Sequence, residues 1–436
     1  MRIFFVCRRV PFPPNRGDKI ATFNQIRHLS ERHEVHVFCL GDGAHDVKNI
    51  PGLRDYASTI TTIPVNGLKI KWRALKALIA SGALSVAALN EPDLQAAIRR
   101  KHDELRPDLI IVYSSNMAQF AEHLAGVPRI MQFGDLDSLK WQQYANRSRI
   151  PLKWIYRLEQ RRLFAYERHL AQTFSHSLVH TEFEKRDFER LIPGVRVIVV
   201  GNGVDLDYFR SAGEAKQPGA MMFTGVMNYR PNVDAVVWFC CEILPIVRSE
   251  IPAATLTICG THPTAAVRRL ARQPGVVVTG WVPDPRPYLD RAEIFVAPLR
   301  MARGVQNKLL EALAMGLPCV ASTAARRGTV LKEGDGLLAT DDPKEFATQI
   351  IRLLRDANWR AEMAHNARTA VDANYRWDVQ MAHLDRVIAS AAPQPPAHVR
   401  SLRRIAHGSH SGAQRSSNLE PANTDHWERP AEPEAF

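Results

Sequence analysis

The sequence predicts an α/β protein with two parallel sheets, each covered by helices on both faces. The chain has 436 residues, which is too long for one ordinary hydrophobic core. Its 45% hydrophobic and 23% charged residues give the balance of a globular protein. Short β-branched and aromatic runs alternate with helical patterns, and this alternation restarts after a linker-like stretch at 211–219. Such alternation is typical of parallel sheets.

The first 210 residues are expected to form an N-terminal domain. Short apolar runs flanked by polar breaks predict its strands, and apolar residues at helical spacing predict its helices. The expected strands are Ile3–Cys7, Glu34–Leu40, Asp108–Tyr113, Pro128–Phe133, His176–Thr181 and Val195–Val200, with helices at Asp18–Arg32, Lys153–Gln172 and Glu182–Leu191. The first strand is short and ends at an arginine pair, so it does not resemble a signal peptide.

A second domain is expected over residues 220–374. Its strands are predicted at Ala220–Thr224, Ala254–Cys259, Val276–Thr279, Ile294–Ala297 and Pro318–Ala321, each followed by a helix. A last helix is expected at residues 375–390. The tail 391–436 is rich in Pro, Ser, His and Ala and lacks aliphatic periodicity, so it is predicted to be disordered.

The net charge of +12 indicates an anionic partner, either a phosphorylated small molecule or a lipid surface. No nucleic-acid-binding module is recognisable, so nucleic acid is not expected. No run approaches the roughly 20 apolar residues that span a bilayer. Cysteine spacing matches neither CxxC pairs nor metal sites, which predicts buried, reduced thiols in the cytoplasm. The six are Cys7, Cys39, Cys240, Cys241, Cys259 and Cys319.

One segment, 68–80, is a basic amphipathic helix candidate. Leu68, Trp72, Leu75 and Ile79 share one helical stripe, and four Lys or Arg residues lie among them. Such a helix can lie on an anionic membrane. The alternative is an ordinary surface helix whose stripe packs on the core.

The stretch 297–321 contains the residues from which a ligand-binding site is predicted. A strand ends at Ala297, a loop with Gly304 follows, and a helix starts near Gln306. The free N–H groups of a helix N-terminus suit a diphosphate, and Lys308 adds positive charge there. Glu311 lies three residues later on nearly the same face, where a carboxylate can accept ribose hydroxyls. The alternative is a routine surface Lys–Glu pair.

This stretch resembles the nucleotide-sugar site of GT-B glycosyltransferases of family 4. Further motifs in the family's order are 202–209, 223–232 and 278–283, and the resemblance covers roughly residues 1 to 390. The segments 11–19 and 134–138 are similar to a subgroup linked with bacterial exopolysaccharide and PEP-CTERM/exosortase systems. The resemblance implies two Rossmann-like domains facing across a cleft, with the C-terminal helix, 375–390, crossing back.

The resemblance also implies residue roles. Glu311 would bind the ribose, Lys308 and Arg230 the diphosphate, and Val282 the base through its backbone. Gly17, after the first strand, would allow close approach of the backbone to the donor; its alternative is a plain turn glycine. The other positions expected to line the donor site are Gly225, Asn228, Asn232, Gly260, Arg300, Arg303, Gly304 and Asn307.

Two positions depart from the family pattern. Arg303 stands eight residues before Glu311, where the family has a glutamate that contacts the transferred sugar. The family's histidine after the fourth strand is absent, and Asp135 is the residue placed to take part of its role. Two DxD triplets, 135–137 and 205–207, resemble metal-binding motifs, but the basic residues 300–308 already supply positive charge, so no metal is expected.

The expected function is therefore transfer of a hexose from a nucleotide sugar to a lipid-linked or polysaccharide acceptor, in exopolysaccharide biosynthesis. The resemblance implies retention of the anomeric configuration without a metal. We expect a cytoplasmic protein, peripheral at the inner face of the membrane. Two alternatives stay open: a nucleotide-sugar epimerase of the same fold, and a non-catalytic scaffold of an export assembly, which Arg303 favours.

Overall fold

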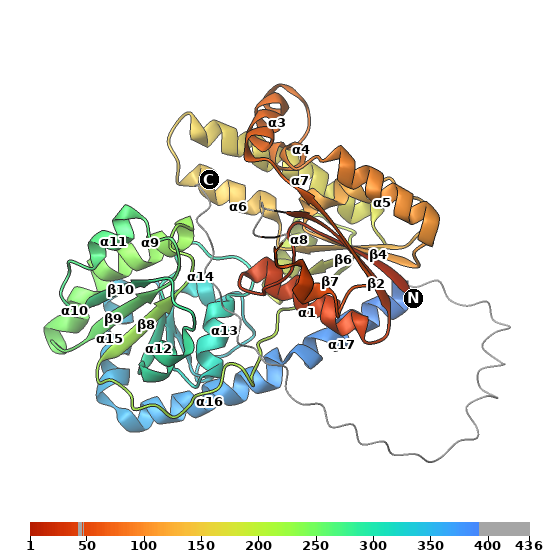
Figure 1. The fold of residues 1–436 in the computed structure, drawn as a ribbon. Helices are drawn as coiled ribbons and strands as arrows, with labels where there is room; N and C mark the ends of the chain where they lie inside the picture. Colours follow the sequence, from red (N-terminus) through yellow and green to blue (C-terminus); the bar gives the residue numbers. More distant parts are fainter. Residues whose placement is uncertain (42–45, 47, 392–436) are drawn as a thin grey trace, which may run out of the picture.

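The computed structural model describes residues 1–41, 46 and 48–391. These residues form two α/β units, each built on its own parallel sheet (Figure 1). Of the tail predicted to be disordered, all but Ala391 lies outside the described residues.

The N-terminal sheet has seven parallel strands in the order β3-β2-β1-β4-β5-β6-β7. Its centre is almost wholly buried because helices cover both faces, so its strands are continuous apolar runs rather than alternating ones. The strands are β1 (Arg2–Cys7), β2 (Glu34–Gly41), β3 (Thr59–Pro64), β4 (Leu109–Tyr113), β5 (Arg129–Gly134), β6 (His176–Val179) and β7 (Val197–Val199).

Seven α-helices accompany this sheet in the described part of the chain: α1 (Gly17–Ser30), α3 (Gly67–Ile79), α4 (Leu84–Ala88), α5 (Pro92–Leu105), α6 (Asp137–Asn146), α7 (Leu152–Thr173) and α8 (Glu182–Leu191). Two 3-10 turns, η1 (Ile50–Leu53) and η2 (Ser115–Phe120), complete the unit. Helices α1 and α8 follow β1 and β6 directly, so their first turns lie at the carboxyl edge of the sheet.

The C-terminal sheet has six parallel strands in the order β10-β9-β8-β11-β12-β13. They are β8 (Ala220–Thr224), β9 (Thr255–Cys259), β10 (Val276–Gly280), β11 (Ile294–Ala297), β12 (Cys319–Ala321) and β13 (Leu337–Ala339). Around them lie α9 (Arg230–Trp238), the π-helical turn η3 (Phe239–Ile243), α10 (Leu244–Glu250), α11 (Ala265–Leu270), α12 (Arg286–Arg291), α13 (Asn307–Ala314), α14 (Thr323–Arg326), α15 (Pro343–Arg355) and α16 (Ala357–Tyr375).

The last helix, α17 (Trp377–Ala391), returns to the N-terminal unit. Its buried residues Met381, Leu384 and Ile388 join the hydrophobic cluster of Ile3 and Phe5 in the first strand. Figure 1 shows α16 and α17 running from beneath the second sheet to beneath the first. The first strand and the last described helix therefore pack in the same hydrophobic core.

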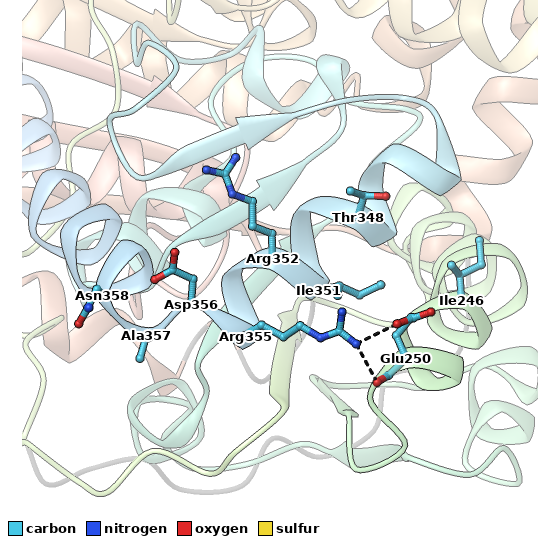
Figure 2. Close-up of a pocket in the computed structure, with 9 residues that line it drawn as sticks. All are labelled: Ile246, Glu250, Thr348, Ile351, Arg352, Arg355, Asp356, Ala357 and Asn358. Carbon is cyan, nitrogen blue, oxygen red and sulfur yellow. Dashed lines mark hydrogen bonds and ion pairs between the residues drawn. The ribbon is translucent and has the colours of Figure 1, made fainter.

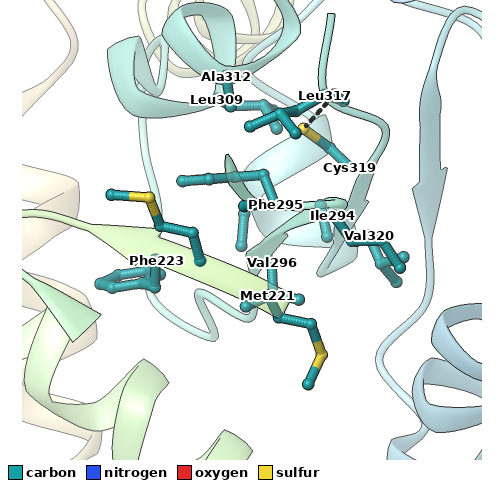
Figure 3. Close-up of a cluster of buried hydrophobic side chains, with 14 of the residues drawn as sticks. Met221, Phe223, Ile294, Phe295, Val296, Leu309, Ala312, Leu317, Cys319 and Val320 are labelled. Carbon is teal, nitrogen blue, oxygen red and sulfur yellow. Dashed lines mark hydrogen bonds between the residues drawn. The ribbon is translucent and has the colours of Figure 1, made fainter. Parts of the chain in front are cut away.

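Helix α13 is held firmly against the second sheet. Leu309 and Ala312 are fully buried and lie over Phe295 and Cys319, which are paired on neighbouring strands, as Figure 3 shows. The rings of Phe223 and Phe295 stack with their centroids 6.4 Å apart. Because its inner face is packed, the helix presents its first turn at a defined place above the carboxyl edge of the sheet.

Several expectations need correction. The strands β3 and β13 and the helices α5, α15 and α16 were not predicted as separate elements. Five cysteines are buried as expected, but Cys241 is exposed. The stripe of α3 does not pack on the core: its side chains point outward, so the alternative of an ordinary core-packed helix is wrong.

Candidate active site

Lys308 lies among polar and aromatic groups at the carboxyl edge of the second sheet. Its Nζ donates a hydrogen bond of 2.6 Å to Oδ1 of Asn232, in the first turn of α9. The same Nζ lies 4.5 Å from the ring centroid of Phe223 in β8. The amide of Asn232 is itself fixed, because its Nδ2 donates to the carbonyl of Val226 at 2.9 Å. The ammonium is therefore positioned before any ligand binds.

Glu311 lies one turn along α13 from Lys308, and each affects the other's ionisation. Burial lowers the pKa of Lys308 to about 7, although the charge of Glu311 opposes that shift. Burial raises the pKa of Glu311 to about 7, and Lys308 opposes it in turn. Tyr208 is close enough for the Glu311 charge to contribute to raising its pKa, after burial and Asp284. A polar ligand that reached both groups would restore their charges.

Two glycines make room for this arrangement. A Cβ on Gly225 would lie 2.7 Å from the Nζ of Lys308 and 2.7 Å from the Nδ2 of Asn232. A Cβ on Gly260 would lie 1.6 Å from the carbonyl oxygen of Gly225, which no adjustment of a side chain can relieve. Both follow strand ends, β8 and β9, so the two neighbouring strand termini approach each other only because neither residue has a side chain.

The predicted arginines are already paired with protein groups. Arg300 makes two hydrogen bonds to the carboxylate of Asp234, at 2.9 and 2.6 Å. Arg230 donates to the carbonyl of Arg147 at 3.1 Å. Arg303 donates to Glu184 at 2.8 Å and to Asp187 at 3.2 Å, both on α8 of the other unit. Lys308 is thus the best-placed of the predicted cations for an anionic ligand.

The two units meet at this edge. Asn202, after β7, donates from Nδ2 to Oδ1 of Asn307 at 3.1 Å. A Cβ on Gly17, the first residue of α1, would lie 3.9 Å from the Nδ2 of Asn307, and that Nδ2 is buried with no hydrogen-bond partner among the residues that the structure describes. Gly304 has a φ of +61° and donates its N–H to Glu184 at 3.1 Å. The carboxyl edges of the two sheets therefore face each other.

The N-terminal side of this interface carries its own titratable groups. Asp135 follows β5, and burial, together with the charges of Asp137 and Glu184, raises its pKa to about 7. His180 follows β6, where burial lowers its pKa to about 4. Its Nε2 lies 3.5 Å from the hydroxyl of Tyr113, at the end of β4. These groups line the carboxyl ends of three neighbouring strands, which is where parallel sheets bind ligands.

The remaining predicted residues lie nearby on the same edge. Asn228 is exposed in the β8–α9 loop, and Val282 is half-buried in the loop after β10. Sequence reasoning missed Phe223, His180 and the Tyr208–Arg286 pair, in which the guanidinium carbon lies 3.8 Å from the ring centroid. His180 directly follows β6 and Phe223 is the last residue but one of β8, so their place at the carboxyl ends of strands could have indicated them, whereas Tyr208 and Arg286 lie further from any strand end and have no such local signal.

Comparison with known families agrees with this geometry. Residues 19–208 match the family described as Glycosyltransferase Family 4, and residues 218–356 match Glycosyl transferases group 1. The chain is built from two glycosyltransferase family domains. The first domain match contains β5, α8 and all of α1 except its first two residues, and the second contains Gly225, Lys308 and Glu311.

Three curated proteins are similar to this chain, each over part of its own length. A phosphatidyl-myo-inositol mannosyltransferase of Propionibacterium freudenreichii is 27% identical, over 45% of this chain and 51% of its own. A D-inositol 3-phosphate glycosyltransferase of Frankia alni is 28% identical, over 39% and 48%. An uncharacterized protein in the cps region of Klebsiella pneumoniae is 24% identical, over 36% and 42%. The chain spans about half the length of these relatives.

Solved structures show the same fold over most of the chain. The sucrose-phosphate synthase of Thermosynechococcus elongatus has a TM-score of 0.68 at 16% identity, covering 90% of this chain and 100% of that one. Anabaena HepE, solved in complex with UDP, has a TM-score of 0.60 at 14% identity, covering 89% and 100%. The two facing Rossmann-like units are therefore the GT-B fold.

A different hollow lies on the outside of the second unit, away from these residues. Figure 2 shows it between α10 and the α15–α16 junction, lined by Ile246, Ile351 and Asp356. Across it, Arg355 donates to the carboxylate of Glu250 at 2.8 Å. None of the predicted site residues lines it, and it is an open surface depression.

Proposed function

We propose that the chain transfers a sugar from a nucleotide-sugar donor, bound at Lys308 and Glu311, to an acceptor at the carboxyl edge of the first sheet. The observation that carries the proposal is the placement of Lys308. Its ammonium is held by Asn232, faces no carboxylate at hydrogen-bond distance among the described residues, and lies at the beginning of α13. A diphosphate there would receive the ammonium and the free N–H groups of the helix.

The chemistry that follows from this placement is stabilisation of a leaving group. As the bond between the sugar and the diphosphate loosens, negative charge grows on the phosphate oxygens. A fixed ammonium and fixed N–H groups stabilise that charge without reorganising, and this supplies much of the catalysis. Glu311 accepts hydrogen bonds from the ribose in this proposal. Lys308 takes the place that a metal ion fills in other transferases, so we propose a metal-independent reaction. Retention of the anomeric configuration is proposed on the resemblance to family 4.

The donor we propose to test first is a UDP-sugar. Anabaena HepE, which shares the fold, was solved with UDP and with UDP-glucose. Asp135 and His180 would face an acceptor hydroxyl rather than the donor, because they lie on the opposite sheet. We propose a lipid-linked or saccharide acceptor in exopolysaccharide assembly at the inner face of the membrane, on the resemblance of residues 11–19 and 134–138 to that subgroup.

The experiment first measures thermal shifts with UDP-, GDP-, dTDP- and ADP-sugars, since a bound ligand raises apparent stability. It then measures sugar transfer for Lys308→Ala and Glu311→Gln. We expect each to lower transfer by about a hundredfold, or about 3 kcal/mol of transition-state stabilisation, with the fold retained. Lys344→Ala, an exposed position on α15, is the matched control and should transfer normally.

Three results would contradict the proposal. Normal transfer by both site variants would show that the donor binds elsewhere. An isomerised donor without a glycosylated product would indicate an epimerase. Absence of binding to every nucleotide sugar would indicate a scaffold.

A further inference from the structure

Helix α3 exposes a row of large apolar side chains. Leu68, Trp72, Leu75 and Ile79 have exposed fractions of 68, 62, 54 and 95%, and their spacing places them on one face of the helix. The helix itself is well fixed. Asn66 caps its first turn with hydrogen bonds from two backbone N–H groups, Ala77 is buried beneath it, and Arg73 donates to Glu91 at 3.0 Å. These four side chains are therefore exposed even though the helix that carries them is fixed in place.

A second exposed apolar group comes from a distant part of the sequence. Ile150, Leu152 and Trp154 are 71, 50 and 60% exposed at the beginning of α7. Helix α7 also supports α3, because Arg162 donates to the carbonyl oxygens of Ala77 at 2.7 Å and Leu78 at 3.5 Å. Trp154 precedes Arg162 by eight residues, or about 12 Å along the helix. Figure 1 shows α3 and α7 along the same outer edge of the N-terminal unit.

Within the two segments that carry these groups, every charged residue is basic. Residues 66–80 and 147–158 contain no aspartate or glutamate, and each segment contains four Lys or Arg residues. Lys69, Lys76 and Arg149 are exposed. Exposed Trp and Leu flanked by basic residues match the interface of an anionic bilayer, where the rings enter the headgroup layer and the cations meet lipid phosphates. A protein partner or a second copy would not require the one-sided charge.

We propose that α3 and the beginning of α7 together form a docking surface for an anionic lipid bilayer. Among the described residues no helix is long and apolar enough to cross a membrane, so this docking is attachment at the surface. The proposal does not depend on sugar transfer, although it would bring a lipid-linked acceptor to the N-terminal unit. It extends the predicted role of residues 68–80 to a second segment, which periodicity alone did not indicate.

The test uses the full chain and vesicle sedimentation. Vesicles of phosphatidylcholine alone are compared with vesicles that contain about 30 mol% phosphatidylglycerol, at low and high salt. We expect at least about tenfold stronger binding to the anionic vesicles, and loss of most of that preference at high salt. The double variant Trp72→Ser/Ile79→Ser and the single variant Trp154→Ser should each weaken binding about tenfold, since each loses apolar area that enters the lipid.

Matched controls change similar residues elsewhere. Val277→Ser/Val330→Ser removes exposed apolar side chains from the second unit and should bind as the unaltered chain does. Lys69→Gln/Lys76→Gln should lower the anionic preference, while Lys332→Gln/Lys344→Gln should not. Equal binding to both vesicle types, or unaltered binding by the Trp72 and Trp154 variants, would overturn the proposal. The proposal would also be overturned if the unaltered chain bound no vesicles and instead formed a dimer that Trp72→Ser dissociates.

Failure of this proposal and failure of the proposed function give different results. Thermal shifts with nucleotide sugars report the donor site alone. They should be the same for Trp72→Ser/Ile79→Ser as for the unaltered chain, because α3 lies on the outer edge of the N-terminal unit.

Discussion

Arg303 connects the two units, and replacing it should loosen their contact rather than remove a sugar ligand. Its side chain is 12% exposed, and that of its partner Glu184 is 2% exposed. Burial acts against the charged guanidinium, but Glu184, Asp135 and Asp187 more than compensate, so the pKa of Arg303 is raised. The perturbation we propose is Arg303→Gln, which removes the charge and keeps a polar side chain of moderate length.

The expected cost can be worked from the contacts. Removing one partner of a buried ion pair costs about 3–5 kcal/mol, because the other charge stays buried. Glu184 keeps its hydrogen bond from the Gly304 N–H at 3.1 Å, and Asp187 keeps its 2.8 Å bond from Arg190. These remaining partners place the cost of Arg303→Gln near the lower end, at about 3 kcal/mol. Glu184→Gln leaves Arg303 with Asp187 and should cost somewhat less.

The assay is a double-mutant cycle of Arg303→Gln and Glu184→Gln, read by urea unfolding and by hydrogen exchange at the Gly304 amide. We expect the two changes to be non-additive by about 2 kcal/mol. We also expect the Gly304 amide to exchange faster in both single variants. Additive effects with an unchanged Gly304 amide would refute the pairing.

A second substitution separates the two roles of this position. Arg303→Glu installs the residue that the family pattern has there, but places a third carboxylate beside Glu184 and Asp187. It should be less stable than Arg303→Gln. If Arg303→Glu instead increased sugar transfer, the residue would be an altered donor ligand and not a connection between units.

Three further predictions concern the proposed site. Gly225→Ala should lower donor affinity about tenfold and cost some stability, because its Cβ meets the Lys308 ammonium and the fixed amide of Asn232. Gly260→Ala should destabilise the fold more, because its Cβ meets the backbone of Gly225; titration calorimetry and thermal melting distinguish the two outcomes. Donor binding should take up a proton at about pH 8 and weaken as the pH rises from about 7 to about 8.5, because at pH 8 Lys308, whose pKa is lowered to about 7, is mostly neutral and a diphosphate favours its charged form, while Glu311, whose pKa is raised to about 7, is already mostly ionised. Calorimetry at pH 8 in buffers of different ionisation enthalpy should show this uptake in the unaltered chain and none in Lys308→Arg. Burial raises the pKa of Asp135 to about 7, so the contribution of this carboxyl group to stability falls as the pH rises from its unfolded pKa of about 4 to about 7. Asp135→Asn should therefore melt at a higher temperature than the unaltered chain at about pH 8, and at nearly the same temperature at about pH 4. Equal melting temperatures of the two proteins at both pH values would contradict the assignment.

The sequence by itself determined the two-sheet architecture and the candidate donor helix. Strands such as Ala220–Thr224 and Ile294–Ala297 have the predicted bounds, because buried parallel strands are continuous apolar runs that local pattern records. The N-terminus of α13 was predicted within a residue, since the glycine-bearing loop and the Lys–Glu spacing are local features. The three-residue strand β13 and the weakly amphipathic α16 were missed because short or weakly patterned elements depend on tertiary packing.

Only the tertiary structure decided which charges meet. Lys308 and Asn232 are 76 residues apart, and Arg303 and Glu184 are 119 residues apart, so no local pattern could pair them. The sequence predicted that Lys308, Arg300 and Arg303 all lie in the donor site and add positive charge there. Folding gives both arginines carboxylate partners and leaves Lys308 with a neutral amide. Likewise, periodicity described the stripe of α3, but only its packing on α7 and α4 determined that the stripe faces outward.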